Sequence, residues 1–176
     1  MGKIIAIANQ KGGVGKTTTA INLAASFAVN DLPVLLVDTD PQGNSTTGLG
    51  IHKNSGALTI YDALLRATPL SDVLVPTELD GLHLVPADKD LVGANIELAD
   101  HHNREFRLKE ILAPLRDRFR YILVDCPPAL DLLTLNALVA ADSVLIPIQC
   151  EFFALEGISQ LLDTIDRLRG SLNPSL

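Results

Sequence analysis

Residues 9–19, with the sequence NQKGGVGKTTT, are the part of the chain best suited to chemistry. The three glycines let backbone N–H groups turn inward and approach a phosphate closely, and the start of a following helix adds a partial positive charge. Lys16 is placed to bridge the β- and γ-phosphates, and the Thr17 hydroxyl is placed to bind Mg²⁺. We therefore predict a nucleotide-binding loop formed by Lys11, Gly12, Gly13, Val14, Gly15, Lys16, Thr17 and Thr18.

Two apolar runs end in an aspartate, VLLVD at 34–38 and YILVD at 121–125. In a parallel sheet the carboxyl ends of the strands meet at the ligand crevice. A lone aspartate after a strand is usually only a turn residue. Because two of them accompany a phosphate loop, we predict a Mg²⁺ site. Asp125 would hold the ion through a water, since Mg²⁺ keeps much of its hydration, and Asp38 would organise the adjacent loop and the magnesium water shell.

The elements that must position these residues alternate between short β-branched runs and helical patterns, which is typical of a parallel α/β sheet. The patterns predict strands at 3–8, 34–38, 82–87, 121–125 and 143–148. They predict helices at 16–29, 59–65, 104–118, 134–142 and 154–168, and a polar loop at 43–55. We expect a doubly wound, mostly parallel sheet in a single domain over residues 1–176.

Composition narrows the function classes. The chain has 176 residues, 47% of them hydrophobic, and a formal net charge of −7, which argues against a generally basic nucleic-acid-binding surface. Its two cysteines lack CxxC spacing, and its apolar runs are strand-length, so we expect a cytoplasmic protein without a membrane span. Cys126 is expected to be a packing residue, and the His101–His102 pair a solvated loop.

One feature of the loop departs from the generic GxxxxGK[ST] pattern: Gln10 stands where glycine is expected, and Lys11 precedes the paired glycines. The stretch resembles the deviant Walker A motif, KGGxGK[ST], of the ParA/MinD class of P-loop ATPases. DTDPQGNSTTGLG, YILVDCPPALDLLTLNAL and VLIPIQCEFFALEGISQLL resemble the ParA/Soj partitioning branch, over nearly the whole chain. DCPP and QCEFFALEG distinguish it from the MinD cell-division ATPases.

The resemblance implies an ATP- and Mg²⁺-dependent ATPase that serves chromosome or plasmid partitioning. It implies a nucleotide-sandwich homodimer in which Lys11 reaches the partner's phosphates, as an arginine finger does. Asp40 would position the attacking water beside the Mg²⁺, so the expected catalytic residues are Lys11, Lys16 and Asp40, and the expected metal residues are Thr17, Asp38, Asp40 and Asp125. Hydrolysis would be slow and accelerated by a ParB-like partner.

Members of this family are longer than this chain, which ends where a further strand is expected. The resemblance assigns an adenine-contacting segment and the basic residues for non-specific DNA binding to that C-terminal part. We therefore do not expect this chain to bind DNA, and expect association with the nucleoid only for a full-length protein.

Two other functions remain open. A metabolic ATP-dependent ligase on the same core would need a small-molecule pocket beside the γ-phosphate, and the sequence shows no extra acid–base constellation to build one. A core that binds nucleotide or a partner without hydrolysis is favoured only by the missing C-terminal part, because every motif residue is present.

Overall fold

The computed structural model describes residues 1–52, 57–150 and 154–176. These residues form a six-stranded sheet in the order β3-β4-β2-β5-β1-β6. Its neighbouring strands are parallel except for β3 and β4, which are antiparallel. The strands are β1 (Lys3–Ile7), β2 (Val34–Asp38), β3 (Val75–Pro76), β4 (Leu82–Val85), β5 (Tyr121–Asp125) and β6 (Ser143–Leu145). The predicted mostly parallel α/β fold is confirmed.

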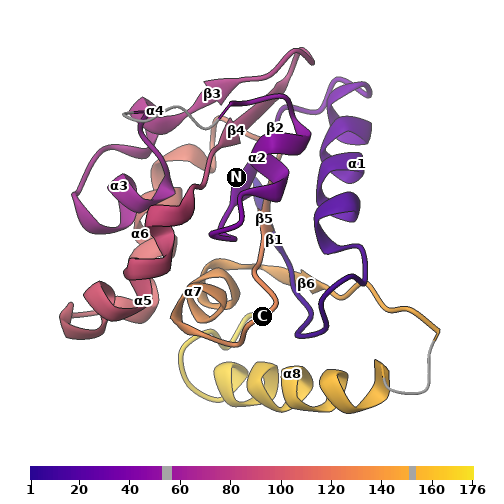
Figure 1. The fold of residues 1–176 in the computed structure, drawn as a ribbon, viewed down its shortest axis with the longest axis vertical. Coiled ribbons are helices and arrows are strands. Elements are labelled where there is room, and N and C mark those ends of the chain that lie inside the picture. The colour runs from indigo at the N-terminus through magenta and orange to yellow at the C-terminus, as the bar shows by residue number, and fades with distance from the viewer. Residues whose placement is uncertain (53–56, 151–153) are drawn as a thin grey trace.

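Helices cover both faces of this sheet (Figure 1). The α-helices are α1 (Lys16–Ala28), α2 (Asn44–Gly48), α3 (Ile60–Leu65), α4 (Leu70–Val73), α5 (Ala94–Glu97), α6 (Arg107–Leu112), α7 (Leu132–Ala140) and α8 (Ala154–Arg169). Short 3₁₀ helices occupy Lys89–Gly93, Leu98–Asp100, Arg104–Phe106 and Ala113–Leu115. The described helices include none long and apolar enough to cross a membrane.

Helix α1 packs on one face of the sheet through small residues. Ala20, Ala24 and Ala28 recur every fourth position and are buried against Leu36 and Leu123 of the central strands. Residues four apart lie on one face of a helix, and their small side chains bring α1 close to the sheet. The buried apolar residues of α3, α4, α6, α7 and α8 belong to the core on the other face.

The register of the central strands brings the two acidic strand ends together. β5 lies between β1 and β2, with Asp125 opposite Ile7 on one side and Asp38 on the other. The strand VLLVD is buried at every position, as expected for a central parallel strand covered on both faces. The phosphate loop begins at the carboxyl end of β1, beside Asp125 and one strand away from Asp38.

Several predicted boundaries were wrong. The predicted helix 104–118 is split into a 3₁₀ turn, α6 and a second 3₁₀ turn that contains Pro114, since proline cannot donate the next helical hydrogen bond. The predicted loop 43–55 contains α2, which begins after Gly43 in the left-handed conformation. The strands predicted at 82–87 and 143–148 end at Val85 and Leu145. Residues 53–56 and 151–153, which belong to the predicted loop and the QCEFFALEG motif, lie outside the described residues.

Candidate functional site

The phosphate loop joins β1 to the first residue of α1, as the sequence predicts. Gly13 and Gly15 have φ values of 75° and 90°, in the left-handed region that favours glycine because a Cβ atom is strained there. The backbone of Gly15 caps α1, and its carbonyl accepts a hydrogen bond from Thr19 N at 2.8 Å. The loop therefore delivers Lys16 and Thr17 in the first turn of the helix, where the helix dipole favours an anion.

Lys16 lies between the loop and the acidic strand ends. Its side chain is buried, and its Nζ donates a hydrogen bond to the carbonyl oxygen of Lys11 at 3.1 Å. Burial lowers the pKa of Lys16, while the nearby carboxylates of Asp125 and Asp40 oppose that shift. The ammonium group is thus placed where it faces both carboxylates and the loop.

Asp125 has one carboxylate oxygen bonded and one without a donor. Oδ2 accepts a hydrogen bond from Ser45 Oγ at 2.7 Å, whereas Oδ1 is buried without a hydrogen-bond donor among the described residues. Burial raises the pKa of Asp125, and the hydroxyls of Ser45 and Thr17 act in the opposite direction. A buried carboxylate oxygen rarely lacks a partner, so Oδ1 is suited to accept a hydrogen bond from a water on Mg²⁺.

Asp38 is fully buried and uses both of its oxygens within the protein. Oδ1 accepts from Asp40 N at 3.1 Å, and Oδ2 accepts from Thr46 N at 2.8 Å and Thr46 Oγ1 at 2.7 Å. Burial raises the pKa of Asp38 to about 6, despite the hydrogen bonds from Thr46. These hydrogen bonds join the end of β2 to the loop that follows it.

Asp40 lies at the edge of a pocket beside the phosphate loop. Its Oδ1 accepts a hydrogen bond from Gln42 N at 2.9 Å, which fixes the DPQGN turn. The pocket has a volume of about 360 Å³ and is lined by Gly12, Gly13, Gly15, Lys16, Thr17, Thr18, Asp40, Gln42, Asn44 and Pro128. It brings together most of the predicted site residues. Val14, Asp38 and Asp125 are buried and do not line it.

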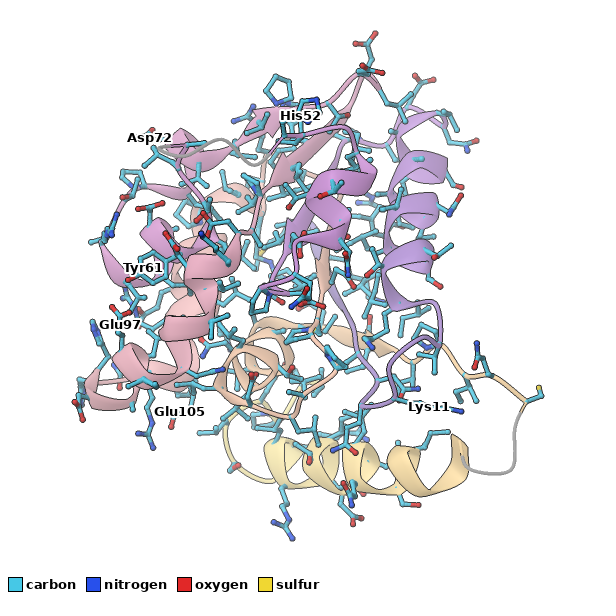
Figure 2. The ribbon with its side chains drawn as sticks, in the orientation of Figure 1. Lys11, His52, Tyr61, Asp72, Glu97 and Glu105 are labelled. Atoms are coloured by element: carbon cyan, nitrogen blue, oxygen red, sulfur yellow. The ribbon has the colours of Figure 1, made fainter. Side chains whose placement is uncertain are left out.

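Lys11 is half-buried on the same loop and is held through its backbone. Its N–H donates to Asn9 Oδ1 at 3.0 Å, and its carbonyl accepts from Lys16. Figure 2 places its side chain on the opposite side of the view from Tyr61 and Glu97.

Four residues that position the site were missed by the sequence analysis. Ser45 and Thr46 hold the two aspartates, Asn9 Nδ2 donates to Pro147 O at 2.8 Å, and Gln149 Nε2 donates to Gly13 O at 3.0 Å. Asn9 and Gln149 therefore tie the phosphate loop to the segment after β6. The hydroxyl pair directly after DPQGN was the available signal for Ser45 and Thr46.

The cysteine and histidine residues considered in the sequence analysis do not form a second catalytic or metal site among the described residues. Cys126 is buried, and burial raises the pKa of its thiol further above neutral, as expected for a packing residue. His101 and His102 are exposed. Within the described ranges, no three His, Cys, Asp or Glu side chains are grouped to hold a metal by themselves.

A family model and several known proteins match this chain over nearly its whole length. A family model described as an AAA domain matches residues 2–176. The chromosome partitioning protein ParA of Myxococcus xanthus is 60% identical over 176 residues, which are 100% of this chain and 62% of that protein. The sporulation initiation inhibitor protein Soj of Bacillus subtilis is 52% identical over 100% of this chain and 70% of its own length.

A solved structure is similar to this chain in fold as well as in sequence. The cobyrinic acid a,c-diamide synthase from Mycobacterium smegmatis, solved with a bound ATP analog and magnesium, superposes with a TM-score of 0.95. It is 42% identical, and the match covers 100% of this chain and 72% of that one. The chain spans less than two thirds of the length of the ParA protein from Myxococcus xanthus. Together with the phosphate loop and the paired aspartates, these similarities show that the chain belongs to the ParA/Soj family of P-loop ATPases.

Proposed function

We propose that this chain binds ATP and Mg²⁺ in the pocket beside the phosphate loop and hydrolyses ATP slowly, as the core of a DNA-partitioning ATPase. The observation that carries the proposal is the convergence of Lys16, Asp40 and Asp125 at the carboxyl edge of the sheet. Phosphoryl transfer depends mainly on positioning and charge stabilisation, and this edge provides both.

Each residue has a separate task in the proposed reaction. The backbone N–H groups of the loop and Lys16 bind the β- and γ-phosphates, and Thr17 offers its hydroxyl to Mg²⁺. The ion, when bound, neutralises charge that develops on the phosphates. Asp125 Oδ1 would accept a hydrogen bond from a water of the ion, and Asp40 would orient the attacking water.

Lys11 is proposed to act on a second copy of the chain. Its backbone contacts with Asn9 and Lys16 fix the place from which its side chain extends. In a sandwich dimer that ammonium group would neutralise charge on the partner's phosphates, as an arginine finger does. ATP contacts then favour the dimer, and hydrolysis removes them, so the nucleotide shifts the population between monomer and dimer.

Partners beyond the dimer are proposed from the family. A ParB-like protein would stimulate hydrolysis, and the setting would be the cytoplasm. The arginine-rich segment 104–120 is a poor DNA surface, because Arg104, Arg107 and Arg116 each form a salt bridge with an acidic residue. DNA binding through this segment, and association with the nucleoid, are therefore not proposed for this chain.

Calorimetry with ATP and Mg²⁺ tests the proposed site. We expect binding heat for the unsubstituted chain and none for Lys16→Ala. The exposed Lys89 provides a control, because Lys89→Ala removes the same charge outside the pocket. Equal binding by Lys16→Ala and the unsubstituted chain would refute the site, and phosphate release then distinguishes an ATPase from a core that binds without hydrolysis.

One observation favours a second candidate, an amide-forming ligase. The similar Mycobacterium smegmatis structure is named as a diamide synthase, and such an enzyme would phosphorylate a small carboxylic acid. The test is phosphate release measured with and without a carboxylic acid and an amine donor. Release that requires both compounds would support the ligase, whereas release that ignores them supports the partitioning ATPase.

A further inference from the structure

Ser45 and Thr46 are neighbours at the start of α2, and each holds one of the two aspartates at the strand ends. Ser45 Oγ donates to Asp125 Oδ2 at 2.7 Å, whereas Thr46 donates to Asp38 Oδ2 through both N and Oγ1. Both side chains are fully buried. One turn of a five-residue helix therefore contacts the carboxyl ends of β5 and β2.

Thr46 is fixed on its other side as well. Its Oγ1 accepts a hydrogen bond from Ala87 N at 3.0 Å, two residues beyond the end of β4. Because a hydroxyl has a single proton, that proton goes to Asp38 while Ala87 supplies the second bond. Thr46 is thus an anchor that joins α2 to the ends of two neighbouring strands.

Ser45 makes a different connection. Its single hydroxyl proton goes to Asp125 Oδ2, and the other oxygen of that carboxylate, Oδ1, is the one without a donor. This hydrogen bond restrains the rotation of the carboxylate, on which the nearby Thr17 hydroxyl also acts. Ser45 therefore contributes to the direction in which Asp125 presents the oxygen that is suited to a water on Mg²⁺.

The segment before Ser45 belongs to the pocket. Asp40, Gln42 and Asn44 line it, and Gly43 N donates to Asp40 O at 2.8 Å, so 40–44 form one hydrogen-bonded turn. Asn44, the last residue of this segment, directly precedes Ser45 in α2. A shift of the turn when a phosphate fills the pocket would reach Ser45 directly, while Thr46 stays anchored.

We propose that Ser45 is a positioning residue that couples the 40–44 turn to the magnesium-holding carboxylate of Asp125. The inference rests on the proposed function, because it assigns Asp125 to Mg²⁺. Removal of the Ser45 hydroxyl should weaken the response to the metal and leave the nucleotide contacts of the loop in place. A serine that only satisfied a buried hydrogen bond would not affect the response to the metal in this way.

The test compares the unsubstituted chain with Ser45→Ala, which removes a single oxygen, and a thermal melt of each protein checks that both are folded. Affinity for a non-hydrolysable ATP analogue is measured by calorimetry with saturating Mg²⁺ and again with EDTA. We expect the gain in affinity that Mg²⁺ gives to fall about tenfold in Ser45→Ala, the effect of losing one hydrogen bond to a charged group. Affinity in EDTA should stay unchanged.

Thr59→Ala is the matched control. Thr59 is a buried hydroxyl residue whose side chain belongs to the capping box of α3, away from the phosphate pocket. Its loss should lower the melting temperature without changing the response to Mg²⁺. An equal loss of affinity with and without Mg²⁺ in Ser45→Ala, or no loss in either, would overturn the inference alone. An unsubstituted chain that binds no nucleotide would overturn the proposed function and this inference together.

Discussion

The Nζ atom of Lys16 lies 3.1 Å from the carbonyl oxygen of Lys11, so the side chain of one loop lysine is bonded to the backbone of the other. This bond requires nothing from the side chain of Lys11. The two lysines can therefore be separated experimentally, since removing the Lys11 side chain leaves the contact with Lys16 available.

Lys11→Ala is expected to retain nucleotide binding and to lose ATP-dependent dimerisation. The reason is that the proposed task of this ammonium group lies in the partner's site, where it neutralises phosphate charge. Calorimetry with ATP and Mg²⁺ measures the first property and light scattering measures the second. Lys16→Ala is the matched variant, because it should lose both. A Lys11→Ala protein that dimerises with ATP as well as the unsubstituted chain would remove the role in trans.

Asp40→Ala is expected to accumulate as a dimer in ATP and Mg²⁺. Asp40 is proposed to orient the attacking water, so the variant should bind ATP, associate and fail to reset by hydrolysis. Gel filtration of the variant and of the unsubstituted chain, each with and without ATP, measures the difference. If both remain monomeric while calorimetry shows bound ATP, the proposed dimer is wrong for this chain.

The central fold was predictable because its strands are continuous apolar runs with clear ends. The strands at 34–38 and 121–125 have the predicted bounds, and each ends at an aspartate proposed for the site. The helix at 104–118 was predicted from its amphipathic pattern, which continues through Pro114 although the backbone cannot. Helix α2, with the sequence NSTTG, has no apolar repeat to reveal it.

The positions of the site residues were predictable, but their partners were not. Motif spacing places Lys16 and Thr17 at a helix start, and strand ends place Asp38 and Asp125 at one edge. The bond between Ser45 and Asp125 spans 80 positions, and local pattern carries no information on such a distant pair. It depends on β2 and β5 being neighbours, which follows only from the completed sheet.

Gly15→Ala is expected to lower the free energy of unfolding by about 1 kcal/mol. A Cβ atom at Gly15 meets nothing within 4 Å, so the cost comes from its φ of 90° and not from a clash. Gly12 is the matched control, because its added Cβ is equally unobstructed and its φ is not in the left-handed region. Urea unfolding of both variants measures the difference. Equal stability of the two would show that the loop relaxes around Gly15 without strain.

Stability is expected to fall as the pH rises through the folded-state pKa of Asp38. Burial raises that pKa to about 6, whereas an aspartate in an unfolded chain titrates near about 3.9. The folded protein therefore binds this proton more tightly, so the contribution to stability is complete below about pH 4 and is lost as the pH passes about 6. Burial raises the pKa of Asp125 as well, and its contribution has the same sign.

Urea unfolding of the unsubstituted chain and of Asp38→Asn, from about pH 4 to about pH 7, isolates this contribution. The amide does not titrate, so the contributions of all other groups cancel in the difference between the two proteins. Over this range the unsubstituted chain should lose on the order of 2 kcal/mol relative to the variant. The amide also places a donor opposite Thr46, which lowers the stability of the variant by a constant amount and leaves the slope unaffected. A difference that is flat with pH would mean that Asp38 keeps an ordinary pKa despite its burial.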